Sequence, residues 1–413
     1  MDTYLHALNR CFFSANSDSG ALNGDFPDAI LPSEAGNEHF MTQRLKILNI
    51  VGARPNLPKI APLMHEMQLH PEIDAILVHT GQHYDEKLSD IFFRQMGIPS
   101  PHVNLEVGSG SHASQTAEIL KRIEPVLIER KPDLVLVVGD VNSTIAVSLA
   151  AAKLGIRVAH VEAGLRSFDR TMPEEINRIL TDALADYLFV TEEDAIAHLL
   201  KEGRPRESIF MVGNVMIDSL RHFLPIAQES AIGDELSLKN GAGWQRFAVL
   251  TLHRPSNVDS LEKLSQLLGA IDAVAAEMPV IFPVHPRTQQ RLTQGGIQHH
   301  PQLRLIPPVG YLDFLCLLSK AKLVLTDSGG IQEETTALGV PCLTLRENTE
   351  RPITISQGTN LLVGTDPAKI VAAARDTLAG RGKAGRLPPL WDGHAAKRIV
   401  DILLREVSRG NAS

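Results

Sequence analysis

The stretch from Asp133 to Arg178, DLVLVVGDVNSTIAVSLAAAKLGIRVAHVEAGLRSFDRTMPEEINR, decides the fold. Its apolar run Leu134–Val138 predicts a buried parallel strand. The alanine-rich segment Thr144–Lys153 predicts a helix that ends at Gly155, and Arg157–Val161 predicts a second strand. Strand, helix and strand in this order form a βαβ unit, so the stretch indicates an α/β fold with a parallel sheet.

Three carboxylates of this stretch stand at predicted element ends. Asp140 and Glu162 follow the two strands, and Glu174 comes after Pro173, which favours the first turn of a helix. Because parallel sheets bind ligands at the carboxyl ends of their strands, we expect these acids to face one crevice. Crowded carboxylates have pKa values that move apart, which suits acid and base catalysis. Two alternatives remain open: Asp140 caps the next helix, and Glu162 pairs with Arg166.

The composition is that of an ordinary globular protein. A hydrophobic fraction of 44% with 21% charged residues fits two packed domains, for which 413 residues suffice. The net charge of −8 argues against nucleic acid as the main partner. We find neither a secretory signal nor an apolar run that could span a bilayer. Cys11, Cys316 and Cys342 lack paired or metal-like spacing, so we expect a cytoplasmic protein with Cys342 in its core.

Apolar runs alternate with amphipathic segments along nearly the whole chain, which predicts two α/β domains around a shared cleft. Residues 1–44 are polar and aperiodic, and we expect a flexible N-terminal extension there. We expect the first domain at 45–214 and the second at 215–393. A final helix at about 394–408 would pack back on the first domain.

The run Thr326–Gly330, TDSGG, predicts a strand end, a glycine turn and a helix start. Free N–H groups at a helix start favour a phosphate, and the Ser328 hydroxyl can add a contact. Glu334, one turn later, could reach a ribose hydroxyl. The alternatives are a tight turn with a capping serine and a glutamate on a solvated helix face.

Basic side chains recur at predicted strand ends. Arg54 follows the first strand, and Lys59 lies on the helix after it, so both could meet a diphosphate. His253 and His285 end two strands of the second half, where a histidine could protonate a leaving phosphate. Each residue alone is more often structural. Similar positions are held by Gln82, His83 and Arg351.

Eight motifs, in this order, resemble the non-hydrolysing UDP-N-acetylglucosamine 2-epimerases: GARP, GDVNST, HVEAGLRS, MPEEINR, LHR, PVHPRT, TDSGGIQEE and RENTERP. The resemblance covers residues 45–405. It implies two Rossmann-like domains with parallel sheets facing across a cleft, as in the glycosyltransferase B and glycogen phosphorylase group. It also implies an isomerase that works without metal or nicotinamide cofactor.

The resemblance implies a reaction in which UDP leaves C1 while the C2 proton is removed. The product, 2-acetamidoglucal, then takes UDP back after protonation on the opposite face, which interconverts UDP-GlcNAc and UDP-ManNAc. By resemblance the catalytic residues are Asp140, Glu162, Glu174 and His253, with the carboxylate for each face left open. The implied UDP contacts are Arg54, Lys59, Phe314, Ser328, Gly329, Gly330, Glu334 and Arg351.

The resemblance further implies a homodimer that supplies cell-surface polysaccharide synthesis and is activated by a second UDP-GlcNAc. The residues implied for that allosteric site are Gln82, His83, Glu175 and His285. Departures from the family pattern at HRPSNVD, at Val309 and at Arg351-Pro352-Ile353 leave the exact nucleotide sugar open. A glycosyltransferase of the same fold, an epimerase for a related UDP-acetamido sugar, a hydrolysing variant and a binding regulator are the alternatives.

Overall fold

The computed structural model describes residues 44–81 and 93–410. The expectation for residues 1–44 therefore lies almost wholly outside the described residues, as do Cys11, Gln82 and His83. None of the described helices combines the length and the apolarity needed to cross a bilayer.

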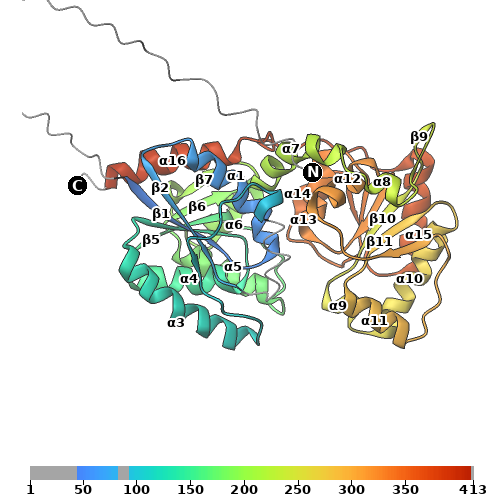
Figure 1. Cartoon of the computed structure of the whole chain (residues 1–413), viewed down its shortest axis with the longest axis horizontal. Coiled ribbons are helices and arrows are strands. Elements are labelled where there is room, and N and C mark those ends of the chain that lie inside the picture. The colour runs from blue at the N-terminus through green and yellow to red at the C-terminus, as the bar shows by residue number, and fades with distance from the viewer. Residues whose placement is uncertain (1–43, 82–92, 411–413) are drawn as a thin grey trace, which may run out of the picture. The chain divides into compact units, whose positions relative to one another are not determined.

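The N-terminal lobe is built on a seven-stranded parallel sheet of order β3-β2-β1-β4-β5-β6-β7 (Figure 1). Its strands are β1 (Leu45–Val51), β2 (Ile73–His79), β3 (Val103–Asn104), β4 (Leu134–Val138), β5 (Arg157–Ala163), β6 (Tyr187–Val190) and β7 (Ile209–Met211). Its helices are η1 (Arg54–Asn56), α1 (Leu57–Gln68), α3 (His112–Arg130), α4 (Asn142–Lys153), α5 (Pro173–Leu184) and α6 (Glu193–Lys201). The 3-2-1-4-5-6 strand order is that of a doubly wound Rossmann sheet.

The C-terminal lobe repeats this order in a six-stranded parallel sheet, β12-β11-β10-β13-β14-β15. Its strands are β10 (Ala248–Thr251), β11 (Val280–Pro283), β12 (Leu303–Ile306), β13 (Leu323–Thr326), β14 (Cys342–Thr344) and β15 (Asn360–Leu362). Its helices are α8 (Ile232–Glu235), α9 (Pro255–Val258), α10 (Leu261–Ala275), α11 (Pro286–Gln294), α12 (Tyr311–Lys320), α13 (Gly329–Leu338), α14 (Pro352–Ser356) and α15 (Pro367–Asp376). The two sheets confirm the predicted fold class.

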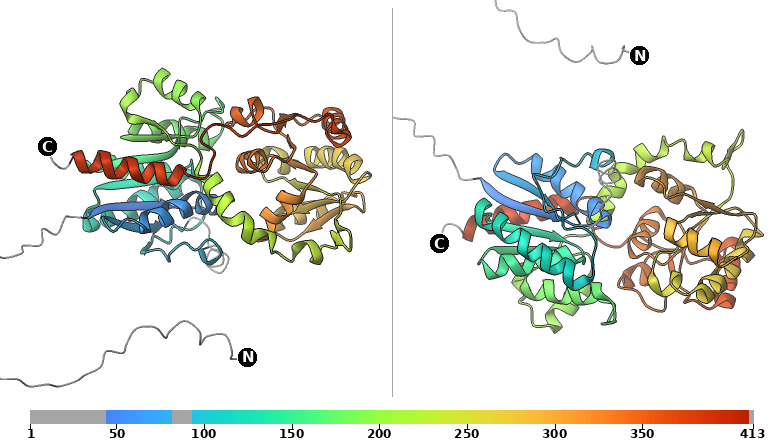
Figure 2. Two further views of the ribbon diagram at one scale, coloured as in Figure 1. Left: turned by 90° about the horizontal axis from the view of Figure 1, so that it is seen from above. Right: turned by 60° about the horizontal axis from the view of Figure 1, so that its bottom comes forward.

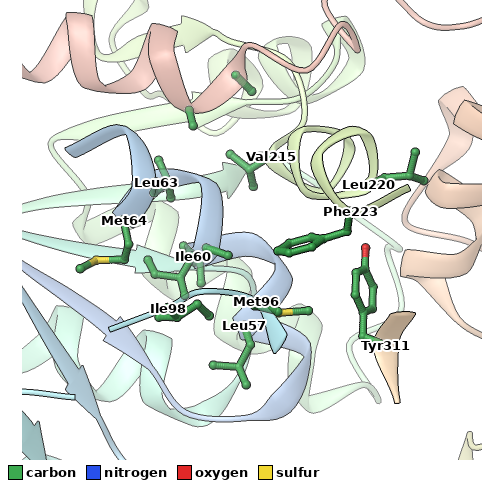
Figure 3. Packing of buried hydrophobic residues seen from close by; sticks show 14 of the residues in the cluster. Leu57, Ile60, Leu63, Met64, Met96, Ile98, Val215, Leu220, Phe223 and Tyr311 are labelled. Carbon is green, nitrogen blue, oxygen red and sulfur yellow. The ribbon is translucent and has the colours of Figure 1, made fainter. Parts of the chain in front are cut away.

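Helix α7 (Val215–Gln228) packs on α1 of the first lobe and on α12 and α13 of the second. Its Phe223 meets Tyr311 of α12 edge to face, with ring centroids 5.9 Å apart (Figure 3). Leu57 and Ile60 of α1 belong to the same apolar cluster. Burial of this shared cluster, which excludes water from both lobes at once, holds them together.

Helix α16 (Ala395–Gly410) contacts α1 and β1, so the last described helix lies beside the first described strand and helix (Figures 1 and 2). Asp218 of α7 caps the start of this helix. Its carboxylate accepts hydrogen bonds from the Ala395 N–H at 3.1 Å and from the Ala396 N–H at 2.7 Å. Just before it, the Trp391 indole donates to the Thr191 carbonyl at 3.2 Å.

Element ends differ from the expectations in places that matter. Strand β5 runs to Ala163, so Glu162 lies inside the strand and not behind it. Helix α4 starts at Asn142, two residues earlier than expected. The two-residue strands β3, β8 (Lys239–Asn240) and β9 (Gly243–Trp244) were not predicted, because segments so short show no alternation. Cys342 is buried as expected.

Candidate active site

The strand order of each sheet reverses between its two central strands, β1 and β4 in one lobe and β10 and β13 in the other. Such reversals are the usual ligand sites of doubly wound sheets. Gly139, directly after β4, has a φ of +69°, and a Cβ there would lie 2.9 Å from the Lys59 Nζ. The glycine therefore lets the ammonium of α1 approach the end of β4 closely.

Glu162 has a φ of +71°, an uncommon conformation for a glutamate, and lies where the pairing of β5 with β6 shifts register. A bulge of this kind turns a side chain away from the regular pleat, and strained residues cluster at functional sites. The Glu162 carboxylate is buried and its Oε2 lies 2.5 Å from the Lys59 Nζ. The alternative pairing with Arg166 is wrong, because Arg166 binds Asp182 at 2.7 Å instead.

Arg351 brings the C-terminal lobe into the same group. It precedes α14, yet its Nη2 lies 3.6 Å from the Glu162 Oε2 of the N-terminal lobe. Its Nε lies 3.2 Å from the Glu333 Oε1 of α13. Burial opposes the charge of Arg351, but four carboxylates raise its pKa, those of Glu333, Glu162, Glu350 and Asp140. Side chains of both lobes thus form one buried ionic group.

The two carboxylates beside Arg351 have pKa values displaced in opposite directions. Burial raises the pKa of Glu162, but Lys59 and Arg351 lower it by more, so it lies below the usual range. Burial raises the pKa of Glu333 to about 7 against the attraction of Arg351. Carboxylates separated in this way are typical of sites that move protons.

Asp140 reaches the site from the end of β4. Its Oδ2 lies 3.2 Å from the Arg178 Nη1, and its carbonyl accepts from the Asn177 Nδ2 at 2.9 Å. The alternative that Asp140 caps α4 is wrong, because Val141 holds the cap position and no side chain caps that helix. Glu174 lies half-buried in the first turn of α5. No ion pair joins Glu174 to Arg351 within the part of the chain that the structure describes.

His253 follows β10, and its Nδ1 lies 2.7 Å from the Asp327 Oδ1 after β13. Asp327 is fully buried and also accepts from the Arg254 N–H and the Asn257 Nδ2. Burial raises the pKa of Asp327, but His253 lowers it by more, so the acid stays ionised. A carboxylate at Nδ1 orients the ring and leaves Nε2 for a ligand, since the His253 side chain is 59% exposed. The sequence contained Asp327 within TDSGG, but we assigned it no role.

Helix α13 begins at Gly329 with Ser328 in the cap position, as the TDSGG pattern predicts. The alternative of a capping serine is met in position only, because the Ser328 hydroxyl makes no cap hydrogen bond. A Cβ on Gly329 would collide with the Glu350 carboxylate and lie 3.9 Å from the Arg351 Nε. The helix start, with its N–H groups and this guanidinium beside it, suits an anion.

Glu334 is buried, and its Oε1 accepts from the Tyr311 hydroxyl at 3.3 Å. The alternative of a solvated helix face is therefore wrong. Burial raises the pKa of Glu334 to about 7. Phe314 of α12 is half-buried against the same core. Contacts of both residues with a nucleoside stay predictions.

Arg54 starts the short helix after β1 and is half-buried. Asn56, two residues on, accepts from the N–H groups of Gly52 and Ala53 and donates to the Val138 carbonyl at 3.1 Å. Asn56 thereby ties the loop after β1 to the end of β4. We did not single it out, because an asparagine in a loop carries no specific signal in a sequence.

Two of the four residues expected at a second nucleotide site, Glu175 and His285, lie within the described residues. The Glu175 carboxylate is buried and accepts from the Ser167 N–H and the Phe168 N–H, both at 2.9 Å. His285 is exposed at the cap position of α11. Gln82 and His83 lie outside the described residues. Among the residues that the structure does describe, no group of three or more His, Cys, Asp or Glu is placed to hold a metal ion.

Comparison with known proteins gives one consistent family. The sequence model of the UDP-N-acetylglucosamine 2-epimerases matches residues 65–404. The UDP-N-acetylglucosamine 2-epimerase of Methanococcus maripaludis is 43% identical over 367 residues, which are 87% of this chain and 99% of that protein. The UDP-2,3-diacetamido-2,3-dideoxy-D-glucuronate 2-epimerase of Pseudomonas aeruginosa is 41% identical over 368 residues, 87% of this chain and all of that protein.

A solved structure shows the same relationship. The Methanocaldococcus jannaschii UDP-GlcNAc 2-epimerase in complex with UDP-GlcNAc and UDP superposes with a TM-score of 0.80 at 43% sequence identity. The match covers 87% of this chain and 99% of that one. The chain belongs to the UDP-N-acetylglucosamine 2-epimerase family, as its motifs predicted.

Proposed function

We propose that this protein is a UDP-N-acetylglucosamine 2-epimerase that interconverts UDP-GlcNAc and UDP-ManNAc without metal or nicotinamide cofactor. The observation that carries the proposal is the contact between Glu162 of one lobe and Arg351 of the other. A carboxylate for a sugar proton and a cation for a departing diphosphate are the two groups that this elimination needs. The activity of the relatives named above supports the same conclusion.

The chemistry divides between the lobes. One carboxylate among Asp140, Glu162 and Glu174 removes the C2 proton as the C1–O bond breaks, and UDP departs with the bonding electrons. Another returns a proton to C2 on the opposite face of 2-acetamidoglucal, and UDP adds back at C1. His253, oriented by Asp327, donates a hydrogen bond to the departing phosphate.

The nucleotide occupies the C-terminal lobe in this proposal. The diphosphate lies at the start of α13, with Ser328, Gly329, Gly330 and Arg351 as its contacts. Glu334 accepts from a ribose hydroxyl, and Phe314 lies against the uracil. Arg54 and Lys59 approach the sugar phosphate from the N-terminal lobe.

We further propose the lobe boundaries 45–214 and 215–393, with the last helix, about 394–408, returning to the first lobe. Assembly as a homodimer, cytoplasmic location and supply of cell-surface polysaccharide synthesis are part of the same proposal. Activation by a second UDP-GlcNAc would involve Gln82, His83, Glu175 and His285.

A second substrate is favoured by one specific observation. The Pseudomonas aeruginosa relative, 41% identical, is named for a diacetamido uronate. The departures at HRPSNVD and at Ile353 lie in motifs that otherwise match the family. Parallel assays with UDP-GlcNAc and with the UDP-diacetamido uronate decide between the two, since the true substrate has the higher kcat/KM.

The decisive experiment incubates the protein with UDP-GlcNAc in heavy water and follows the sugar by NMR. Deuterium at C2 with UDP still attached is the expected result. Free ManNAc would indicate hydrolysis, and transfer to an acceptor without exchange would indicate a glycosyltransferase. Glu162→Gln should reduce exchange by at least about 100-fold. Arg381→Gln, which changes an exposed arginine paired with Asp376, is the matched control.

A further inference from the structure

Four buried side chains alternate in charge across the two lobes. The Lys59 Nζ lies 2.5 Å from the Glu162 Oε2, and the same oxygen lies 3.6 Å from the Arg351 Nη2. Arg351 also forms an ion pair with Glu333, and its Nε lies 3.2 Å from the Glu333 Oε1. Glu333 is held in turn by the Asn214 amide at 2.8 Å. Arg351 is thus shared by two carboxylates, and one of them is the proposed acid–base residue Glu162.

The contact between Arg351 and Glu162 is the weakest in this row. Charge-assisted N–H···O pairs have lengths of about 2.7–2.9 Å, so a separation of 3.6 Å is an ion pair without a hydrogen bond. By contrast, Lys59 contacts Glu162 at hydrogen-bonding distance. When a competing anion binds nearby, we therefore expect the contact between Arg351 and Glu162 to break before the contact between Lys59 and Glu162.

Arg351 also has two unused donors beside the expected anion site. Its Nη1 and Nε are both buried, and neither has a hydrogen-bond partner among the described residues. Its Nε lies 3.9 Å from the place where a Cβ of Gly329 would stand, at the start of α13. Buried donors without acceptors are costly. A diphosphate at this helix start would accept hydrogen bonds from both the guanidinium and the helix N–H groups and would remove that cost.

We propose that Arg351 gates Glu162: it shields the carboxylate in the ligand-free site and turns to the diphosphate when the nucleotide sugar binds, so that Glu162 becomes an effective base only in the loaded site. This inference rests on the proposed function. In one direction of the epimerisation, Glu162 then accepts the C2 proton. The C–H electrons form the C1–C2 double bond, and the C1–O electrons leave with UDP.

The charged groups around Glu162 make this gate specific to Arg351. Lys59 stays in contact through its own hydrogen bond. His160 is held by Asp182 at 2.6 Å and by the Gly139 carbonyl at 2.8 Å, so its position does not depend on a ligand. The groups that face Glu162 are Lys59, Arg351, His160 and Glu333. Arg351 also lies beside the start of α13, where the diphosphate is proposed to bind.

The first test compares the pH dependence of kcat with that of kcat/KM for C2 deuterium exchange in UDP-GlcNAc. The kcat profile reports groups in the loaded enzyme, and the kcat/KM profile reports the free enzyme. The phosphates of UDP-GlcNAc are esterified on both sides and do not titrate in this range. Since an opposite charge within 4–6 Å lowers a carboxyl pKa by about 1–3 units, the acidic limb of kcat should lie about one pH unit or more above that of kcat/KM. Coinciding limbs, or the reverse order, would overturn the gate.

Two arginine variants sharpen this comparison. In Arg351→Gln no cation leaves Glu162 on binding, so the two acidic limbs should coincide. Arg346→Gln removes a cation that contacts Glu350 at 2.8 Å and not Glu162, so the separation of the limbs should remain as in the wild type. A separation that disappears in Arg346→Gln, or persists in Arg351→Gln, contradicts the assignment.

The second test needs no turnover. Calorimetry of UDP binding between pH 5 and 6, in two buffers of different ionisation enthalpy, counts the protons taken up. The UDP phosphate contributes the same proton uptake in both proteins. In the wild type, Glu162 also takes up protons when Arg351 turns away from it, so the wild type should take up more protons than Glu162→Gln. Equal uptake, or no binding of UDP, would overturn the gate. Absence of exchange at every pH, together with the extra proton uptake, would instead overturn only the proposed function.

Discussion

At the scale of single residues, the site depends on backbone conformations that few residue types adopt. Gly139 has a positive φ and faces the Lys59 ammonium, while Glu162 adopts a similar φ without being glycine. Such strain persists only where the surrounding structure enforces it. Here the enforcing contacts are the Lys59 ion pair and the register shift of β5.

The variant Gly139→Ala tests whether the close approach of Lys59 to the end of β4 matters for activity, and Gly155→Ala is its matched control. A non-glycine residue at positive φ costs about 1–2 kcal/mol, and the Cβ would also displace the Lys59 Nζ. Gly155→Ala has the same backbone strain, with a φ of +71°, but its Cβ meets nothing within 4 Å. Chemical denaturation should show losses of similar size in both variants. Exchange activity should fall only in Gly139→Ala, and an equal fall in both would contradict the role assigned to the close approach.

Glu192→Gln tests a buried acid near the ionic group. Burial raises the pKa of Glu192 to about 8, so the folded protein keeps a proton that the unfolded chain releases near pH 4.5. Stability from this group is therefore present at low pH and declines as the pH rises through about 8. Glu192→Gln should be more stable than the wild type at pH 8.5 by at least about 1.4 kcal/mol, which corresponds to a tenfold change in proton affinity, and similar at pH 5. Denaturation at the two pH values measures this difference, and a constant offset would refute it.

At the scale of elements, two helix starts position charged side chains and join distant parts of the chain. The start of α13 lies beside Arg351, and the start of α16 lies under Asp218 of the connecting helix α7. Because Asp218 is distant in sequence from α16, this cap exists only in the folded chain. It joins the last helix to the segment that leads from one lobe to the other.

Asp218→Ala removes this cap, whereas Asp218→Asn keeps an acceptor oxygen. Loss of a cap costs about 0.5–2 kcal/mol, so the alanine variant should be less stable than the asparagine variant by about 1 kcal/mol. Thermal unfolding at pH 7 compares the two. Equal melting temperatures would show that the cap contributes nothing to α16.

At the scale of the whole molecule, the proposed reaction draws its residues from both lobes. Asp140, Glu162, Glu174 and Lys59 belong to the N-terminal lobe, and Arg351 and the start of α13 belong to the C-terminal lobe. A ligand that contacts both halves should draw the lobes together. The shared apolar cluster of α1, α7 and α12 is where such a movement would pivot.

Small-angle scattering of the full chain checks this movement. Addition of UDP should decrease the radius of gyration, because the diphosphate attracts Arg351 and the cations of the N-terminal lobe toward the start of α13. Arg351→Gln should diminish the change. A scattering curve that does not change at saturating UDP would show that binding needs no closure.

The sequence by itself determined the fold class, most strands and the position of the glycine turn at TDSGG. Apolar runs such as Leu134–Val138 report burial on both faces of a strand, and a glycine turn reports its own backbone, so both are local properties. The motifs were long enough to identify the family and to single out Glu162 and Arg351.

Only the tertiary structure decided how these residues combine. Glu162 and Arg351 are far apart in sequence, and nothing local to either indicates that they share a buried ionic group with Lys59 and Glu333. The alternative partner Arg166 was nearer in sequence, yet it binds Asp182. The physical reason is that burial makes charge pairing obligatory, and the partner is then chosen by which lobes and strand ends meet in space.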